Sequence, residues 1–412
     1  FEGVSARLMP ETASLRTVGP GEPFTVVEQS FDFDVISPRR LLEKSVGKEV
    51  TILHRNPTTG ADLPQRVRVL AVGEGVVLES AGHVETAPFP ERVVYEALPP
   101  GLRDRPTLLA RLSAPEPGRR EAELSYLTAG LSWRADYVAE LAGDDSRLDL
   151  KGWVTLTNTT GGAFANARLH LVAGTVNRVQ DLPPPRPVPM AMKAERAAAV
   201  APAAPQQEAF AGYHLYSLER PVTIADNQTR QLALLGGAGI AVEKDYVVTG
   251  ETHQYYNRIG DPAPQKAALV IRFENSGKNH LGEPLPQGTM RVYKPDAGGA
   301  LHFIGEDRLR HTAVDETVKL RLGEDFDVSA LRTQKDFQQV AERVWESTYE
   351  IKLRNAKDRP VTVTLREPMP GDWQVLQESA PHTRESARLP VWSIAVPAAG
   401  QAVLTYRVRV KL

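Results

Sequence analysis

Hydrophobic and polar residues alternate along much of the chain in short runs. The clearest run covers residues 133–141, where the alternation extends over nine positions. A two-residue period is typical of a strand with one face in a core and the other in solvent. The prolines and glycines fall between the apolar runs, not inside them, and a further run closes the chain at 402–410. This pattern predicts an all-β chain of short strands joined by turns.

Residues 37–98 have the densest punctuation of short apolar runs. Ser37 followed by Pro38 is typical of a helix N-cap and first helical position, which predicts one short helix over 37–43. Turns are expected at 56–60 and 73–75, and the strands lie at 48–53, 66–70, 76–79 and 92–95. Four or five short strands in about sixty residues predict a small, strongly bent barrel of SH3-like type. The alternative is a meander inside a larger sheet.

One arrangement recurs three times: an alternating strand that ends in Asn, a turn, and a second strand. The three copies are 151–158 with 167–172, 268–275 with 289–293, and 349–355 with 361–365. An Asn after a strand can bond its own backbone two residues on, and it tolerates the left-handed conformation of a turn. We therefore expect two or more immunoglobulin-like β-sandwich domains.

These segments divide the chain into domains. The expected parts are a β-sandwich domain of 1–36 and 99–180 with the barrel 37–98 inserted, a linker at 181–211, a second sandwich region at 212–334, and a C-terminal immunoglobulin-like domain at 335–412. Runs 106–112 and 122–127 look like strands paired with each other. The linker is rich in Pro, Ala and Gln, so it cannot bury enough apolar surface and is predicted to be disordered. Residues 327–345 also fit a helical spacing, but their flanks favour strand.

Composition excludes several classes of protein. Among 412 residues, 49 Lys and Arg balance 51 Asp and Glu, which argues against a nucleic-acid binder. The absence of cysteine rules out disulfides, iron–sulfur clusters, thiolate zinc sites and cysteine nucleophiles. No apolar stretch approaches the roughly 20 residues of a transmembrane segment. The chain opens at Phe1 without Met, so we expect that a segment such as a signal peptide was removed before it or that the ordered part begins there.

The histidines and carboxylates offer the first candidates for chemistry. No histidine pair has the i, i+4 spacing with an adjacent Glu of a zinc hydrolase, although His302 and His311 can converge in a hairpin. The nine histidines are His54, His83, His170, His214, His253, His280, His302, His311 and His382. Asp32 and Asp34 flank Phe33, so in a strand they share one face. Two such acids can share a proton or bind a cation, but a solvated strand face explains them as well.

Several other motifs have structural explanations. Residues 130–134 resemble half of a nucleophile elbow around Ser132 but lack its second glycine, and 144–146 form a turn without the glycine and Glu of a calcium loop. Residues 236–239 lack the spacing of a phosphate loop and are expected at a hairpin tip. The tryptophans can form a carbohydrate-binding platform or fill sandwich cores. We therefore predict no catalytic residue, cofactor site or metal site.

Several segments together resemble a known family. Residues 123–137 (ELSYLTAGLSWRADY) look like the signature of a bacterial domain of unknown function, and proteins called mucoidy-inhibitor-A-like carry a related domain. Further matching segments are 169–178, 213–218, 226–231 and 367–373. The resemblance implies an export signal and an initial strand before Phe1, and an extracytoplasmic location. It implies no activity, cofactor or catalytic residue.

The expected function is that of an exported structural or binding protein of the bacterial cell envelope or surface, and not of an enzyme. It would act through sandwich surfaces, with a protein partner or by self-association through edge strands such as the final one. Neither nucleic acid nor a transmembrane segment is expected, and carbohydrate is a further candidate ligand. The alternative is an envelope-polymer hydrolase with Asp32, Asp34 or Asp136 in a cleft between domains. Asp136 lies among aromatic residues, where its pKa could rise.

Overall fold

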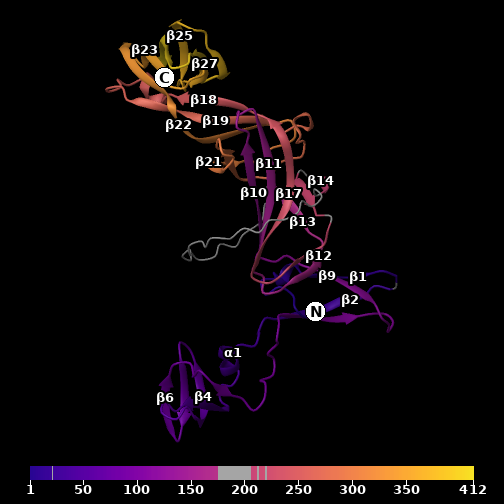
Figure 1. The fold of residues 1–412 in the computed structure, drawn as a ribbon. Coiled ribbons are helices and arrows are strands. Elements are labelled where there is room, and N and C mark those ends of the chain that lie inside the picture. Colours follow the sequence, from indigo (N-terminus) through magenta and orange to yellow (C-terminus); the bar gives the residue numbers. More distant parts are fainter. Residues whose placement is uncertain (21, 175–205, 211–212, 219) are drawn as a thin grey trace. The chain divides into compact units, whose positions relative to one another are not determined.

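The computed structural model describes residues 1–20, 22–174, 206–210, 213–218 and 220–412. About 60% of the chain is strand and about 4% is helix, so the prediction of an all-β sandwich protein is confirmed (Figure 1). The chain forms two compact units. The first contains residues 1–132, 157–167 and 222–229, and the second contains residues 133–156, 168–221 and 230–412. Neither unit is one continuous stretch of sequence.

Outside residues 37–98, the first unit holds three small two-stranded antiparallel sheets. Strand β1 (Ser14–Val18) follows the single turn η1 (Pro10–Thr12) and pairs with β9 (Glu121–Ser125), and β2 (Thr25–Asp32) pairs with β8 (Thr107–Ser113). Runs 106–112 and 122–127 therefore form strands as expected, but the prediction that they pair with each other is wrong. Each run instead pairs with a strand near the N-terminus, and residues 37–98 lie between the two partners in the sequence. The strands β12 (Phe164–Ala167) and β16 (Val222–Ile224) add a third pair.

Residues 37–98 form one helix and five strands around their own core. Helix α1 (Pro38–Glu43) begins where predicted, because the Ser37 side chain accepts a hydrogen bond from the Arg40 backbone N–H at 3.2 Å. The strands are β3 (Glu49–Arg55), β4 (Asp62–Val72), β5 (Val76–Ser80), β6 (His83–Ala87) and β7 (Val93–Val94), in the sheet order β6-β5-β4-β3-β7. Their core consists of Leu42, Val50, Ile52, Val67, Val69, Val76 and Leu78.

The second unit contains a five-stranded sheet of order β17-β11-β10-β20-β21. Its strands are β10 (Leu131–Leu141), β11 (Arg147–Asn158), β17 (Gln228–Ala241), β20 (Gly288–Pro295) and β21 (Leu301–Leu309). Strand β10 pairs in parallel with β20, which is distant in sequence. This pairing explains why residues 133–156 belong to the second unit and not to the sandwich expected for 99–180. The first two residues of β10, Leu131 and Ser132, belong to the first unit.

Two expectations for the middle of the chain need correction. Residues 236–239 lie inside β17 and not at a hairpin tip; a side chain at Gly236 would come within 2.8 Å of the Leu150 carbonyl oxygen, so glycine permits the close strand contact. The expected linker 181–211 lies outside the described residues except for 206–210. Those five residues form β14 (Gln206–Phe210), which pairs with β15 (Tyr213–Ser217) beside β13 (His170–Ala173).

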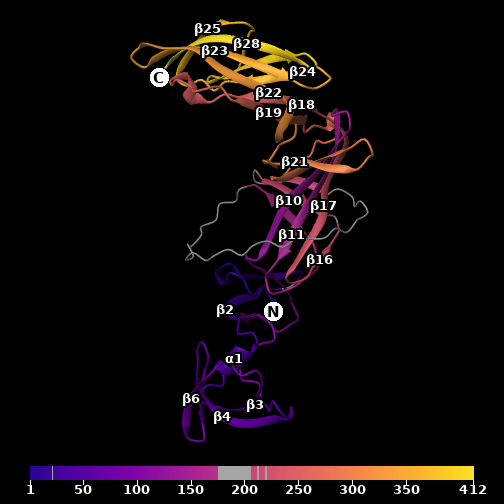
Figure 2. The same cartoon turned by 60° about the vertical axis from the view of Figure 1, so that its left-hand side comes forward.

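The C-terminal part is a sandwich made from a nine-stranded sheet of order β25-β28-β23-β22-β19-β18-β24-β27-β26. Figure 2 shows β23 and β28 on the side of the sandwich away from β18 and β19. The strands are β18 (Glu243–Thr249), β19 (Pro264–Glu274), β22 (Thr317–Ala341), β23 (Val344–Asn355), β24 (Val361–Arg366), β25 (Asp372–Glu378), β26 (Thr383–Ser386), β27 (Leu389–Val396) and β28 (Gly400–Lys411), with the short turns η2 (Thr252–Tyr255) and η3 (Gly277–Asn279). Trp392 and Tyr406 stack in the core between the layers, with ring centroids 4.9 Å apart.

Strand β22 connects the two layers of this sandwich. Its first part pairs with β19 and its later part with β23, so one strand of 25 residues carries the sheet from one layer into the other. The domain boundary expected at 334/335 falls inside this strand. The final strand, expected at an edge, lies between β25 and β23; the edges are β25 and β26. The prediction of strand, and not helix, at 327–345 agrees with β22 and with the start of β23.

The asparagines that end the recurring strands are fully buried. Asn158, Asn275 and Asn355 are between 0% and 1% exposed. After each of them the chain leaves one ladder and enters another: from β11 to β12, from β19 to β20, and from β23 to β24. None of the three adopts a positive φ, so they do not supply the left-handed conformation that the sequence suggested. They mark the points at which the chain changes sheet or layer.

Candidate binding groove

The three candidate acids are each engaged by arginine or lysine. Asp32 pairs with Arg103 at 3.4 Å, and Asp34 pairs with Lys44 at 2.9 Å. These two neighbours in sequence therefore have different partners and do not share a cation between them. Asp136 has a side chain that is 13% exposed and forms ion pairs with Arg134 at 3.0 Å and with Arg291 at 3.3 Å. In each case the structure places the carboxylate in a charge pair.

The histidines make separate local contacts. His302 bonds Asp296 at 2.7 Å, while His311 lies beyond the opposite end of β21 and accepts a hydrogen bond from the Gln287 backbone N–H at 3.2 Å. Their predicted convergence is therefore wrong, because a whole strand separates them. Burial and the neighbouring His214 lower the pKa of His311. Within the described ranges, no three His, Asp or Glu side chains are grouped in a way that could hold a metal ion.

The tryptophans and Ser132 take structural positions. Trp373 and Trp392 are buried in the C-terminal sandwich, and Trp133, Trp153 and Trp345 are half-buried, so two of the five fill a core as sandwich tryptophans do. Ser132 lies in strand β10 and not at a strand-to-helix turn.

Sequence reasoning missed a buried polar cluster around Glu367. This carboxylate is 0% exposed, forms an ion pair with Arg332, and accepts hydrogen bonds from the hydroxyls of Tyr255 at 2.5 Å and Tyr406 at 3.2 Å. Burial, followed by the charge of Glu367, raises the pKa of Tyr255 well above its ordinary value. The hydroxyl therefore stays protonated and donates a hydrogen bond to Glu367. A carboxylate without exposed surface cannot meet a polymer substrate, and we interpret the cluster as structural.

A second missed carboxylate is Asp145, in the turn between β10 and β11. Its side chain is 6% exposed and is surrounded by Lys294, Lys244 at 2.9 Å and Arg359 at 3.1 Å. Burial alone would raise its pKa, but the hydrogen bonds and charges of these cations outweigh it and lower the pKa to about 2. The cations come from β18, β20 and the turn before β24. Asp145 therefore ties the β10–β11 turn to the C-terminal sandwich.

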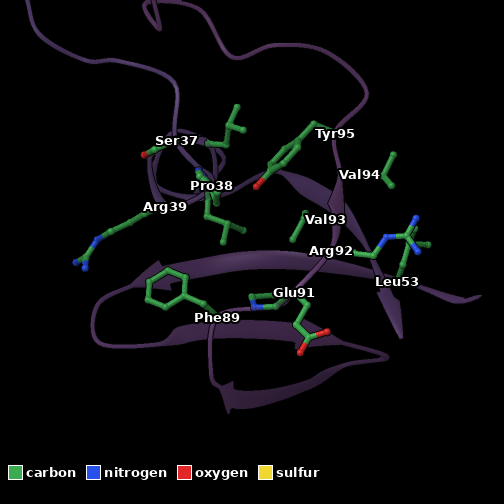
Figure 3. Close-up of a pocket in the computed structure, with 13 residues that line it drawn as sticks. Ser37, Pro38, Arg39, Leu53, Phe89, Glu91, Arg92, Val93, Val94 and Tyr95 are labelled. Atoms are coloured by element: carbon green, nitrogen blue, oxygen red, sulfur yellow. The ribbon is translucent and has the colours of Figure 1, made fainter. Parts of the chain in front are cut away.

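The 37–98 domain carries an open apolar groove between α1, β3 and the segment 89–95. Its volume is about 680 Å³. The lining side chains are Ser37, Pro38, Arg39, Leu41, Leu42, Leu53, Phe89, Pro90, Glu91, Arg92, Val93, Val94 and Tyr95 (Figure 3). In Figure 3 the side chains of Val93 and Tyr95 lie beside the helix that carries Pro38, while Arg39 and Arg92 extend away on opposite sides.

Local structure explains why this groove stays open. Leu42 points from α1 into the domain core and is 2% exposed, whereas Phe89 and Val94 remain 36% and 50% exposed. Strand β7 has only two residues and pairs with Thr51 and Ile52 of β3, so it covers a small part of the sheet edge. Burial raises the pKa of the Tyr95 hydroxyl. The result is a concave apolar surface with few polar groups, the usual form of a binding site.

Among the described residues, two arginines at the rim of the groove have ion-pair partners and one carboxylate has none. Arg39 pairs with Glu43 at 2.9 Å and lies over the ring of Phe89, 5.6 Å from its centroid. Arg92 pairs with Asp62 at 2.6 Å. Glu91 is exposed and makes no ion pair within the part of the chain that the structure describes. The groove thus offers apolar contacts together with one uncompensated carboxylate.

None of the helices in the described ranges has the length and apolar character that a membrane crossing requires. Residues 122–412 match a family described as a domain of unknown function (DUF4139). The chain belongs to this family. The DUF4139 match begins in β9 and contains the whole C-terminal sandwich, whereas the groove of the 37–98 domain precedes it. No curated protein and no protein of solved structure matches the chain.

Proposed function

We propose that this DUF4139 protein is a non-catalytic binding protein of the bacterial cell envelope that holds a partner polypeptide in the groove beneath α1. The groove is the main observation that supports this proposal. It is open and mostly apolar, and it is lined by side chains of α1, β3 and the segment 89–95, which pack against the domain core. The sandwich domains would then act as the structural support of this binding domain.

The proposed envelope location rests on the resemblance to the mucoidy-inhibitor-A-like proteins. We propose that the protein is exported and works in an extracytoplasmic compartment. Fractionation of the native cells, with protease added to intact and to permeabilised cells, tests this. Degradation only after the inner membrane is opened would contradict it.

Self-association through an edge strand is a separate proposal. The edges β25 and β26 both contain a register shift, a feature that discourages pairing between sheets. Strand β21 ends the five-stranded sheet and leaves Leu301 and Phe303 51% and 55% exposed, so it is the better candidate. Light scattering after size exclusion should show a concentration-dependent increase in mass that Phe303→Arg abolishes. A monomer at all concentrations would refute association.

The groove is tested by site-specific photo-crosslinking in the producing cell. A photoreactive phenylalanine derivative at Val94, which is 50% exposed in the groove, should crosslink to a defined polypeptide. The same group at Val84, which is 66% exposed on β6 of the same domain, is the matched control. Mass spectrometry of the adduct identifies the segment that lies in the groove. Equal adducts at both positions, or none at 94, would refute binding at this groove.

A further inference from the structure

The lining of the groove beneath α1 indicates the kind of polypeptide that it accepts. Two prolines and two aromatic rings, those of Pro38, Pro90, Phe89 and Tyr95, supply rigid surfaces that lose little entropy on binding. Grooves built from such rings accept the ridges of a polyproline II helix, which is also rigid before it binds. The lining therefore favours a partner that contacts it through rings and not through flexible side chains.

The backbone around the groove also favours a partner that binds through its side chains. A partner that added a strand would need a run of free N–H and C=O groups, but the edge strand β7 has two residues and is preceded by Pro90. Proline carries no N–H, so a proline-rich segment can enter an apolar groove with fewer donors left unpaired. Docking through side chains thus fits the site better than strand addition.

The charged side chains at the rim of the groove indicate which charge the bound peptide should carry. Because Arg39 and Arg92 already pair with Glu43 and Asp62, the unpaired charge of the groove is that of Glu91. We propose that the groove binds a proline-rich peptide that carries a basic residue among its prolines, placed opposite Glu91. This inference rests on the proposed function, since it names the partner class of the same groove.

The chain itself contains a sequence of this chemistry. Residues 183–189 read Pro-Pro-Pro-Arg-Pro-Val-Pro, with Arg186 between the prolines. A synthetic peptide of residues 181–191 is therefore a suitable probe. The receptor is the full chain in which the prolines of 183–189 are replaced by serine, so that its own segment does not compete.

The experiment is fluorescence anisotropy of the labelled peptide titrated with this receptor. Saturable binding is expected, and Phe89→Ala in the receptor should weaken it about tenfold, as loss of an aromatic anchor does. Glu91→Lys should weaken it about two- to fivefold, the effect of an exposed ion pair, and the peptide with Arg186→Glu should regain affinity for that variant. Glu85→Lys on β6 is the matched control and should leave the affinity unchanged.

Three results would overturn the inference: no saturable binding, equal binding of a peptide with serine in place of proline, or unchanged affinity with Phe89→Ala while circular dichroism shows a folded receptor. Failure of the peptide beside a specific crosslink at Val94 refutes the proline-rich partner and leaves the binding function intact. Failure of both refutes the two together.

Discussion

Asn158 and Asn355 make the same set of hydrogen bonds at two distant points of the chain. Each amide oxygen accepts from the backbone N–H two residues further on, at 3.0 Å in both cases. Each amide nitrogen donates to the carbonyl four residues further on, and also to a carbonyl of a segment distant in sequence: Ala225 for Asn158 and Pro397 for Asn355, both at 2.9 Å. One buried side chain thus satisfies the backbone where the chain changes ladder.

Replacing Asn355 by alanine should lower the free energy of unfolding by about 3 kcal/mol, because buried carbonyls and an N–H lose their partner. Urea denaturation followed by tryptophan fluorescence measures the effect. Asn257→Ala, an exposed position, is the control and should cost less than about 0.5 kcal/mol. Equal stability of both variants would show that water replaces the amide and would contradict the role assigned to Asn355.

The Glu367–Arg332 pair gives a second prediction. Glu367→Gln leaves the buried Arg332 charge without compensation and should destabilise the sandwich by about 3–5 kcal/mol. The double variant with Arg332→Met removes both charges and should be more stable than the single variant. Glu385→Gln, which breaks a more exposed pair with Arg366, should cost at most about 1 kcal/mol. Additive losses in the double variant would contradict a coupled pair.

Asp145 predicts a dependence of stability on pH. Its pKa is about 2 in the folded protein against an ordinary value of 3.8, so folding favours the ionised form. This form contributes about 2 kcal/mol, fully present above about pH 4 and lost as the pH falls towards 2. Asp145→Asn tolerates the same left-handed backbone, at φ 65°, and removes the charge. The stability difference between wild type and variant should therefore shrink between pH 5 and pH 2; a constant difference would contradict the prediction.

Deleting residues 183–204 should leave the folded core intact, because shortening a connection between elements changes the closure entropy little. The midpoint of thermal unfolding is expected to move by no more than about 2 °C. Deleting 206–210 is the comparison, since it removes strand β14 from its ladder with β15. Equal losses from the two deletions would show that 183–204 contributes to the fold.

Much of the fold could be predicted from local pattern. The Ser37–Pro38 cap located α1, and the two-residue period located β10 with Ala135 and Tyr137 on its buried face. Strand pairing could not be predicted in this way, because the parallel pairing of β10 with β20 depends on contacts between distant segments. The expected boundary at 334/335 was wrong for a different reason: the alternation of apolar and polar residues looks alike in one long strand and in two short ones.

The polar clusters were harder to predict. Asp145 follows another Asp in a turn, a context typical of solvent, and only the folded chain brings three cations from separate segments to it. Glu367 stands between strands and looked like any loop carboxylate. Of the groove residues, Val93 was assigned to a strand and Phe89 and Pro90 to no element, and nothing local indicated that the helix would leave them uncovered.

The entry and exit of the 37–98 domain have an evolutionary consequence. The Ile36 N–H bonds the Arg103 carbonyl at 2.9 Å, and the Arg103 N–H bonds the Asp34 carbonyl at 3.0 Å, so the chain returns beside the point where it departs. A segment with adjoining ends can be gained, lost or exchanged by recombination while the remainder keeps its path. Lineages can therefore vary the 37–98 domain independently of the DUF4139 domain. The sandwich lacks this freedom, because β22 serves both of its layers.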